Sequence, residues 1–169
     1  MKCKGLEETF EKVLAVYPNS KGYAYVLMQG PLIILTKRMV SVSPVDNTRI
    51  INDIKTLIRE HCPNAFIIEN PKCKYSRKGV RGNQLLRSLV LCAKYQKIGV
   101  YSYSREDIRL VFEIWKAQTK YEIAEVIAKN IKSFRILLYS KPRYPDSQKY
   151  LTAIFDAVSL GITHYYKTT

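Results

Sequence analysis

The sequence predicts an α/β domain in which a mixed sheet carries helices on its faces. Three apolar segments joined by short turns, at residues 11–17, 23–28 and 32–42, fit an antiparallel meander. Shorter apolar runs then alternate with segments of helical spacing, which is typical of a sheet covered by helices. The chain has 169 residues, enough for a sizeable core, and we expect one domain over residues 1–169.

Each expected strand is bounded by residues that interrupt an extended chain. Pro-Asn-Ser-Lys-Gly at 18–22 separates the first two strands, and Gly30-Pro31 precedes the third. The fourth expected strand, Ala65–Glu69, is apolar until its last residue, and such a run suits a buried central strand. Residues 98–101 form a fifth short strand.

The helical segments are recognised by apolar residues that recur every three or four positions and by capping residues before them. Thr119 with Glu122 forms a capping box, and Ser104 with Asp107 forms a weaker one. The expected starts are Asp46, Asn83, Ser104, Thr119 and, for a last helix running to about Tyr166, Asp146 or Ser147.

Positive charge is high and unevenly distributed. The chain has 28 Lys and Arg against 14 Asp and Glu, a net charge of +14 and a pI near 9.7. Residues 1–70 contribute 9 basic and 7 acidic side chains, whereas residues 71–169 contribute 19 and 7. A field of one sign attracts polyanions, so nucleic acid is the first candidate partner and an anionic membrane surface the second. Solubility alone is the remaining explanation.

The four cysteines favour no metal module and no disulfide framework. They form no C-x-x-C pair, and their spacing matches no standard zinc site. Free thiols are the expectation, with a metal site at His61, Cys62 and Cys73 as the weaker alternative. The N-terminal residues are polar and charged, and no apolar run approaches the roughly 20 residues that span a bilayer. We therefore expect a cytoplasmic protein.

Two carboxylates stand in apolar surroundings. Glu69 ends the expected central strand, at the edge where α/β sheets place ligands. Asp156 lies in the nearly continuous apolar run of the last helix, and a buried charge is normally paired or bound to metal. The alternatives are a Glu69 that faces water and an Asp156 that forms an ion pair with a Lys or Arg.

Three segments carry a family resemblance. They are VLAVYPNSKGYAYVLM at 13–28, AFIIEN at 65–70 and FDAVSLGITH at 155–164. In order and spacing they resemble the opening strand, the second acidic strand and the closing helix of RuvC-type Holliday-junction resolvases. The resemblance covers residues 11–166. It implies a ribonuclease H-like fold, with the first three strands antiparallel and the later strands parallel.

The resemblance implies a degenerate set of metal ligands. The family holds two divalent ions, Mg²⁺ or Mn²⁺, with four carboxylates. Glu69 and Asp156 match two of them and are the candidate catalytic and metal-binding residues, but the other two positions hold Tyr17 and Ala153. A phenol is a poor ligand for a hard cation at neutral pH. The first hypothesis is thus a nucleic-acid-binding protein that is weak or inactive as a nuclease and, if inactive, needs no cofactor. The second is an active Mg²⁺- or Mn²⁺-dependent endonuclease that resolves branched DNA.

Basic residues after Glu69 suit phosphate contacts with base stacking. By resemblance, Arg109 and Lys120 match two cleft lysines of the family, whereas its aromatic wedge position holds Lys72. The candidate nucleic-acid contacts are Lys72, Lys74, Tyr75, Arg77, Lys78, Arg81, Arg87, Arg109 and Lys120. A solvated basic loop is the alternative.

The expected partner is DNA, and no membrane partner is expected. Members of the family form homodimers, and the sequence leaves open whether this chain does. The 13 tyrosines allow a third hypothesis, a protein-interaction module in which the charge is incidental.

Overall fold

The computed structural model describes residues 10–72, 78–143 and 152–169. Its five strands form one sheet in the order β3-β2-β1-β4-β5. β1, β2 and β3 pair antiparallel, while β4 runs parallel to β1 and β5 parallel to β4, which confirms the expected mixed sheet. The strands are β1 (Val13–Asn19), β2 (Gly22–Met28), β3 (Ile34–Ser41), β4 (Ala65–Glu69) and β5 (Gly99–Tyr103).

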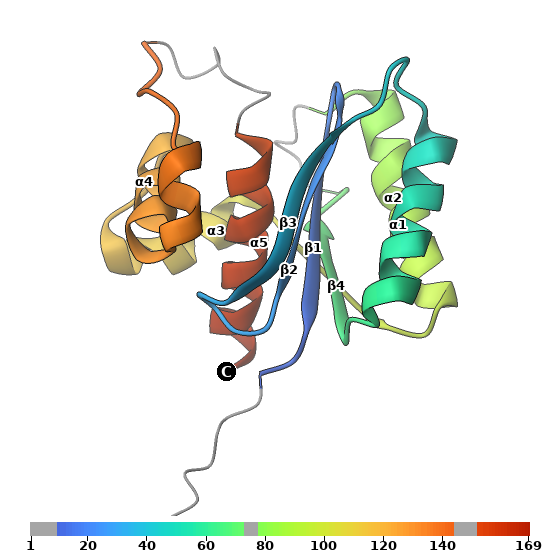
Figure 1. The fold of residues 1–169 in the computed structure, drawn as a ribbon, viewed down its shortest axis with the longest axis horizontal. Coiled ribbons are helices and arrows are strands. Elements are labelled where there is room, and N and C mark those ends of the chain that lie inside the picture. Colours follow the sequence, from blue (N-terminus) through green and yellow to red (C-terminus); the bar gives the residue numbers. More distant parts are fainter. Residues whose placement is uncertain (1–9, 73–77, 144–151) are drawn as a thin grey trace, which may run out of the picture.

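Helices cover both faces of the sheet (Figure 1). α1 and α2 lie on one face, and α5 lies on the other with α3 and α4 outside it. The helices are α1 (Asn47–His61), α2 (Val80–Tyr95), α3 (Arg105–Phe112), α4 (Lys120–Asn130) and α5 (Ala153–Thr168), with short 3₁₀ helices η1 (Glu113–Trp115) and η2 (Lys132–Leu137).

The expected caps at Asp46, Ser104 and Thr119 are all present, and each side chain accepts a hydrogen bond from a backbone N–H of its helix. Several element starts differ from expectation: β1, β2 and β5 by one or two residues, and β3 and α2 by two or three. β3 begins after the expected residue 32 because Gly30 and Ile33 form a hydrogen-bonded turn. α2 begins at Val80, three residues before Asn83. The expected start of the last helix at 146 or 147 lies outside the described residues.

Alternation along the strands divides the core into two layers. In β1, Val13 and Ala15 face α5, whereas Leu14 and Val16 face α1 and α2. The same alternation holds in β4, where Ala65 and Ile67 share the α5 face. Both layers are fully apolar at the centre of the sheet, which explains why β1 and β4 read as continuous hydrophobic runs.

α5 packs very close to the sheet because the facing residues are small. An added Cβ on Gly161 would collide with the Sδ atom of the buried Met28, and it would also touch Ala15. This close approach brings the first turn of α5 against the ends of β1 and β4.

We expect Gly161→Ala to lower the free energy of unfolding by about 1–3 kcal/mol because the added methyl overpacks the fully buried Met28 side chain. Urea unfolding measures the change. A second variant, Gly161→Ala with Met28→Val, should show favourable coupling because the shorter side chain makes room. Strict additivity of the two changes would contradict this explanation.

Candidate functional site

The parallel pairing of β1 and β4 places Tyr17 and Glu69 at the end of the sheet where these two strands finish. We call this end the carboxylate edge. Ala15 pairs with Ile67, and the two site residues each lie two positions further along their strands. Because side chains alternate, both point to the face covered by α5. Tyr17 accordingly packs against the core on that side. This edge lies at the top of the sheet in Figure 1.

α5 brings Asp156 to the same place. Asp156 lies in the first turn of the helix, is 5% exposed, and donates its backbone N–H to the Thr152 carbonyl oxygen at 2.9 Å. A negative side chain is favoured at a helix N-terminus, where unpaired N–H groups carry partial positive charge. That contribution is too small to compensate a buried carboxylate, so cationic partners are needed.

Lys78 is the partner of Glu69. Its Nζ atom lies 3.4 Å from Glu69 Oε2 and donates to the Pro18 carbonyl oxygen at 2.6 Å. The same ammonium group lies 4.2 Å from the centre of the Tyr17 ring, within cation–π distance. The two side chains of the salt bridge are only 14% and 17% exposed. Glu69 is therefore paired with Lys78 and largely buried, and it does not face open water.

Arg105 and Lys120 are the partners of Asp156. Arg105 Nη1 lies 3.6 Å from Asp156 Oδ1, and Lys120 Nζ lies 3.3 Å from Oδ2. Lys120 also lies 5.5 Å from the centre of the Tyr17 ring. We call these five charged residues, Glu69, Lys78, Arg105, Lys120 and Asp156, the ion-pair cluster. The alternative that Asp156 forms an ion pair is thus what the structure shows.

Burial, together with the nearby carboxylates, keeps the phenol of Tyr17 neutral. Burial raises the pKa of Tyr17 well above its ordinary value, and the nearby carboxylates of Asp156 and Glu69 raise it further. Burial also lowers the pKa of Lys78, an effect that the Glu69 carboxylate opposes. A neutral, aromatic Tyr17 contributes a ring face to the cations and no anionic oxygen.

The residues at this edge do not fit a two-metal centre. No three His, Cys, Asp or Glu side chains come together as a metal site within residues 10–72, 78–143 and 152–169. The two carboxylates present are each engaged by a nitrogen cation at 3.3–3.6 Å. A divalent ion prefers several oxygen ligands, and here it would meet three positive side chains instead.

The structure brings together some of the expected nucleic-acid contacts and separates others. Lys78 and Lys120 belong to the ion-pair cluster. Arg81 binds the Asn47 side chain at 2.7 Å and the Asn19 carbonyl oxygen at 3.4 Å, so it joins α1, α2 and the β1–β2 turn. Three candidates are exposed on the surface, and three lie outside the described residues. The exposed ones are Lys72, Arg87 and Arg109, and the others are Lys74, Tyr75 and Arg77.

Sequence reasoning missed Arg105. It is the first residue of α3, directly after the cap Ser104, and Arg109 lies one turn further on with an exposed side chain. The cap predicts where α3 begins, but no sequence signal shows that the first residue of α3 would reach Asp156.

Two other residues that could take part in a reaction, His164 and Asp107, have structural roles instead. His164 Nδ1 lies 2.9 Å from the Tyr103 hydroxyl oxygen, and burial lowers the pKa of this histidine. It follows Asp156 by eight residues, roughly 12 Å along the helix. Asp107 binds Lys167 at 2.7 Å and belongs to the capping box of α3.

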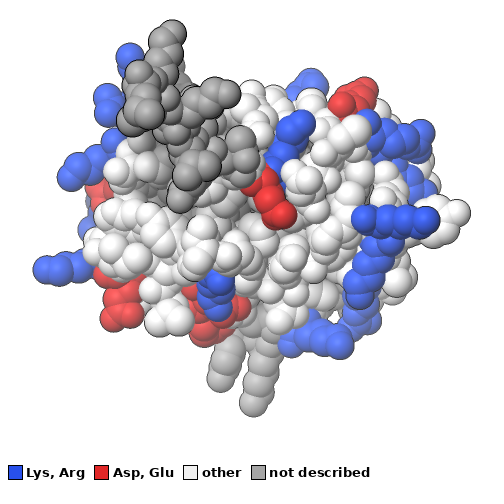
Figure 2. Space-filling view, turned by 90° about the horizontal axis from the view of Figure 1, so that it is seen from below, with Lys and Arg blue, Asp and Glu red and all other residues white. Residues whose placement is uncertain are grey.

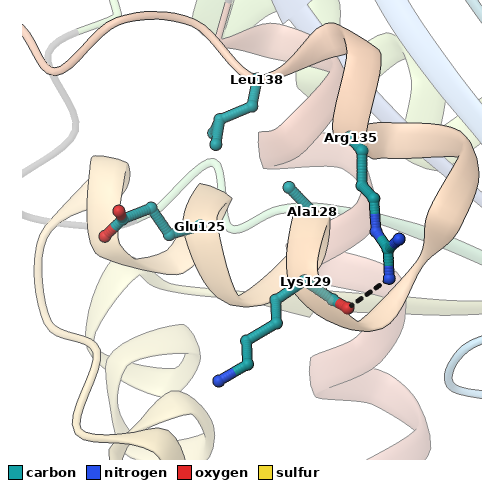
Figure 3. Close-up of a pocket in the computed structure, with 5 residues that line it drawn as sticks. All are labelled: Glu125, Ala128, Lys129, Arg135 and Leu138. Atoms are coloured by element: carbon teal, nitrogen blue, oxygen red, sulfur yellow. Dashed lines mark hydrogen bonds between the residues drawn. The ribbon is translucent and has the colours of Figure 1, made fainter.

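A hollow in the described surface is separate from the ion-pair cluster. A hollow between α4 and η2 is lined by Glu125, Ala128, Lys129, Arg135 and Leu138, where Arg135 donates to the Lys129 carbonyl oxygen at 3.5 Å (Figure 3). None of its lining residues belongs to the ion-pair cluster. Figure 2 shows the molecule from below, with Lys and Arg toward both sides of the view and mostly uncharged residues in its middle.

The free cysteines and the helices agree with two further expectations. Cys62 and Cys92 are free thiols, whereas Cys3 and Cys73 lie outside the described residues. Among the helices that the structure describes, none has the length and apolar character needed to cross a membrane.

We expect Lys78→Met to lower the free energy of unfolding by roughly 3 kcal/mol because it leaves the largely buried Glu69 carboxylate without a partner. Adding Glu69→Gln should restore part of the loss. Denaturant unfolding measures both variants, and Lys129→Met, at an exposed lysine, serves as the matched control. Equal destabilisation by Lys78→Met and by the control would contradict the buried ion pair.

The capping box of α3 predicts a pH dependence. Burial tends to raise the pKa of Asp107, but hydrogen bonds from Lys167 and Ser104 outweigh it and hold the pKa below its ordinary 3.8. The stabilisation is therefore present above the unfolded-state pKa and is lost as the pH falls through the folded-state value. Asp107→Asn should destabilise the protein at neutral pH, and the difference should vanish in unfolding measurements near pH 2. A difference that stays constant over this range would count against the charge-dependent cap.

Comparisons with known proteins identify the fold. No family model and no curated protein matches the chain. The RuvC structure of Thermus thermophilus matches with a TM-score of 0.62 at 16% identity, over 92% of this chain and 95% of that one. T. thermophilus RuvC in complex with a Holliday junction substrate gives 0.64 at 16% identity, over 93% and 94%. Fowlpox virus resolvase in complex with its Holliday junction DNA gives 0.57 at 10% identity, over 92% and 97%. This chain has the ribonuclease H-like fold of RuvC-like resolvases.

Proposed function

We propose that this chain binds branched DNA and cleaves it weakly or not at all. The fold supports the first part, because two of the solved structures that share it are complexes with Holliday junction DNA. The charge supports it as well, since residues 71–169 hold 19 of the 28 basic side chains. Phosphate contacts by Lys and Arg supply most of the affinity in such complexes.

One observation carries the second part of the proposal. Both surviving carboxylates are held by cationic side chains, Glu69 by Lys78 and Asp156 by Arg105 and Lys120. Hydrolysis of a phosphodiester by the two-metal mechanism needs anionic oxygens that hold two ions on either side of the reacting phosphorus. With Tyr17 and Ala153 in place of two further acids, the site lacks those oxygens and has an excess of positive charge.

The runner-up is an active divalent-metal-dependent endonuclease. Glu69 and Asp156 favour it, because their partners Lys78 and Lys120 lie 4.2 and 5.5 Å from the centre of the same Tyr17 ring. In this reading a metal ion displaces Lys78 and Lys120 from the carboxylates. The required displacement of two cations makes it the weaker hypothesis.

The test is a four-way junction incubated with the protein in Mg²⁺ or Mn²⁺ and examined for both binding and strand cleavage. We expect binding that weakens steeply with salt, with tighter binding to the junction than to a linear duplex of the same length, and an intact substrate. Metal-dependent cleavage that Glu69→Gln abolishes would establish the runner-up. Absence of binding at low salt would overturn the proposed function and would favour a protein-interaction role.

A further inference from the structure

The groups around the Lys78 ammonium resemble those of a cation-binding site. A backbone carbonyl oxygen at 2.6 Å, a carboxylate oxygen at 3.4 Å and an aromatic face at 4.2 Å surround Nζ. The side chain is 14% exposed, so little water competes for the charge. Pro18, Glu69 and Tyr17, which supply these groups, come from the ends of two adjacent strands. A fixed positive charge thus lies where β1 and β4 end.

The cluster as a whole has one more positive than negative charge. Lys78, Arg105 and Lys120 face Glu69 and Asp156, and the neutral phenol of Tyr17 adds no charge. Excess positive charge in a partly dehydrated place attracts an anion more strongly than the same charge in open water.

The guanidinium of Arg105 has an unused donor. Its Nη2 atom is buried and makes no hydrogen bond to any residue that the structure describes, although Nη1 faces Asp156 at 3.6 Å. A buried N–H group without an acceptor is costly, so this geometry favours a ligand that brings an oxygen. Lys120, 44% exposed, leaves the neighbouring position open to such a ligand.

We propose that Arg105 and Lys120, with the fixed charge of Lys78 behind them, form a phosphate-binding subsite that needs no divalent metal. Its occupant is a backbone phosphate of DNA, so the proposal rests on the proposed function. The protein's own cations supply the positive charge that metal ions would otherwise bring to the phosphate.

The chemistry of the two donors fits a phosphate. A guanidinium presents parallel N–H donors that match two phosphate oxygens, and an ammonium adds a point charge. Asp156 holds both cations in position through one oxygen each, which orders them before a ligand arrives. A phosphate bound here shares Arg105 and Lys120 with Asp156 and completes the hydrogen bonds of Nη2.

The first experiment measures the affinity of a labelled four-way junction in EDTA for the wild type, Arg105→Gln and Lys129→Gln. Lys129 is exposed on α4, the helix that begins with Lys120, so the control removes an equal charge outside the cluster. We expect Arg105→Gln to weaken binding about tenfold and to reduce the salt dependence by about one phosphate contact. The control should change affinity by about twofold or less.

The outcomes separate this proposal from the proposed function. If the wild type binds in EDTA but Arg105→Gln binds as well as the Lys129→Gln control, the subsite is wrong and DNA binding stands. If the wild type binds only when Mg²⁺ is present, the metal-independent subsite is also wrong. If the wild type binds in neither condition, the proposed function fails and the subsite fails with it.

A second measurement guards against a variant that does not fold. Inorganic phosphate should raise the melting temperature of the wild type in EDTA more than chloride at the same ionic strength. Arg105→Lys, which keeps the charge but loses the paired N–H donors, should retain the fold and lose most of this shift. Equal shifts with phosphate and chloride in the wild type would overturn the proposal.

Discussion

The salt bridge between Lys78 and Glu69 is the interaction on which the carboxylate edge depends. It links the last residue of β4 to the segment that leads into α2, and through the Pro18 carbonyl oxygen it also fixes the end of β1. The ammonium also lies 4.2 Å from the centre of the Tyr17 ring. Removing this cation would leave a largely buried carboxylate beside an aromatic ring, an arrangement that costs free energy without compensation.

The side-chain cations at the carboxylate edge compensate the carboxylates beside them. Four carboxylates close together repel one another unless ions of high charge lie between them. The structure describes two carboxylates at this edge, Glu69 and Asp156, and monovalent side-chain cations compensate them. Lys78, Arg105 and Lys120 supply the positive charge that these two carboxylates need.

Local sequence signals predicted most of the fold and only part of the site. Alternation and capping residues such as Ser104 depend on neighbours in the chain, so the strands and helix starts could be read directly. Glu69 and Asp156 could be singled out because a charge inside an apolar run needs a partner. Which partner it finds is decided by tertiary packing. Arg105 reaches Asp156 because α3 packs against α5, and the periodicity of the sequence does not predict that packing.

The ion pairs that stabilise the carboxylate edge also limit its affinity for a phosphate. Asp156 competes with an incoming phosphate for Arg105 and Lys120, which lowers the affinity of the subsite for any single phosphate. In return, the two cations are already ordered and partly dehydrated, so less entropy and hydration are lost when a ligand arrives. A subsite of this kind binds a free phosphate measurably but weakly, and it contributes more when other phosphates of the same DNA are held elsewhere on the protein. That property agrees with the proposed function, in which the protein binds branched DNA through phosphate contacts at several points.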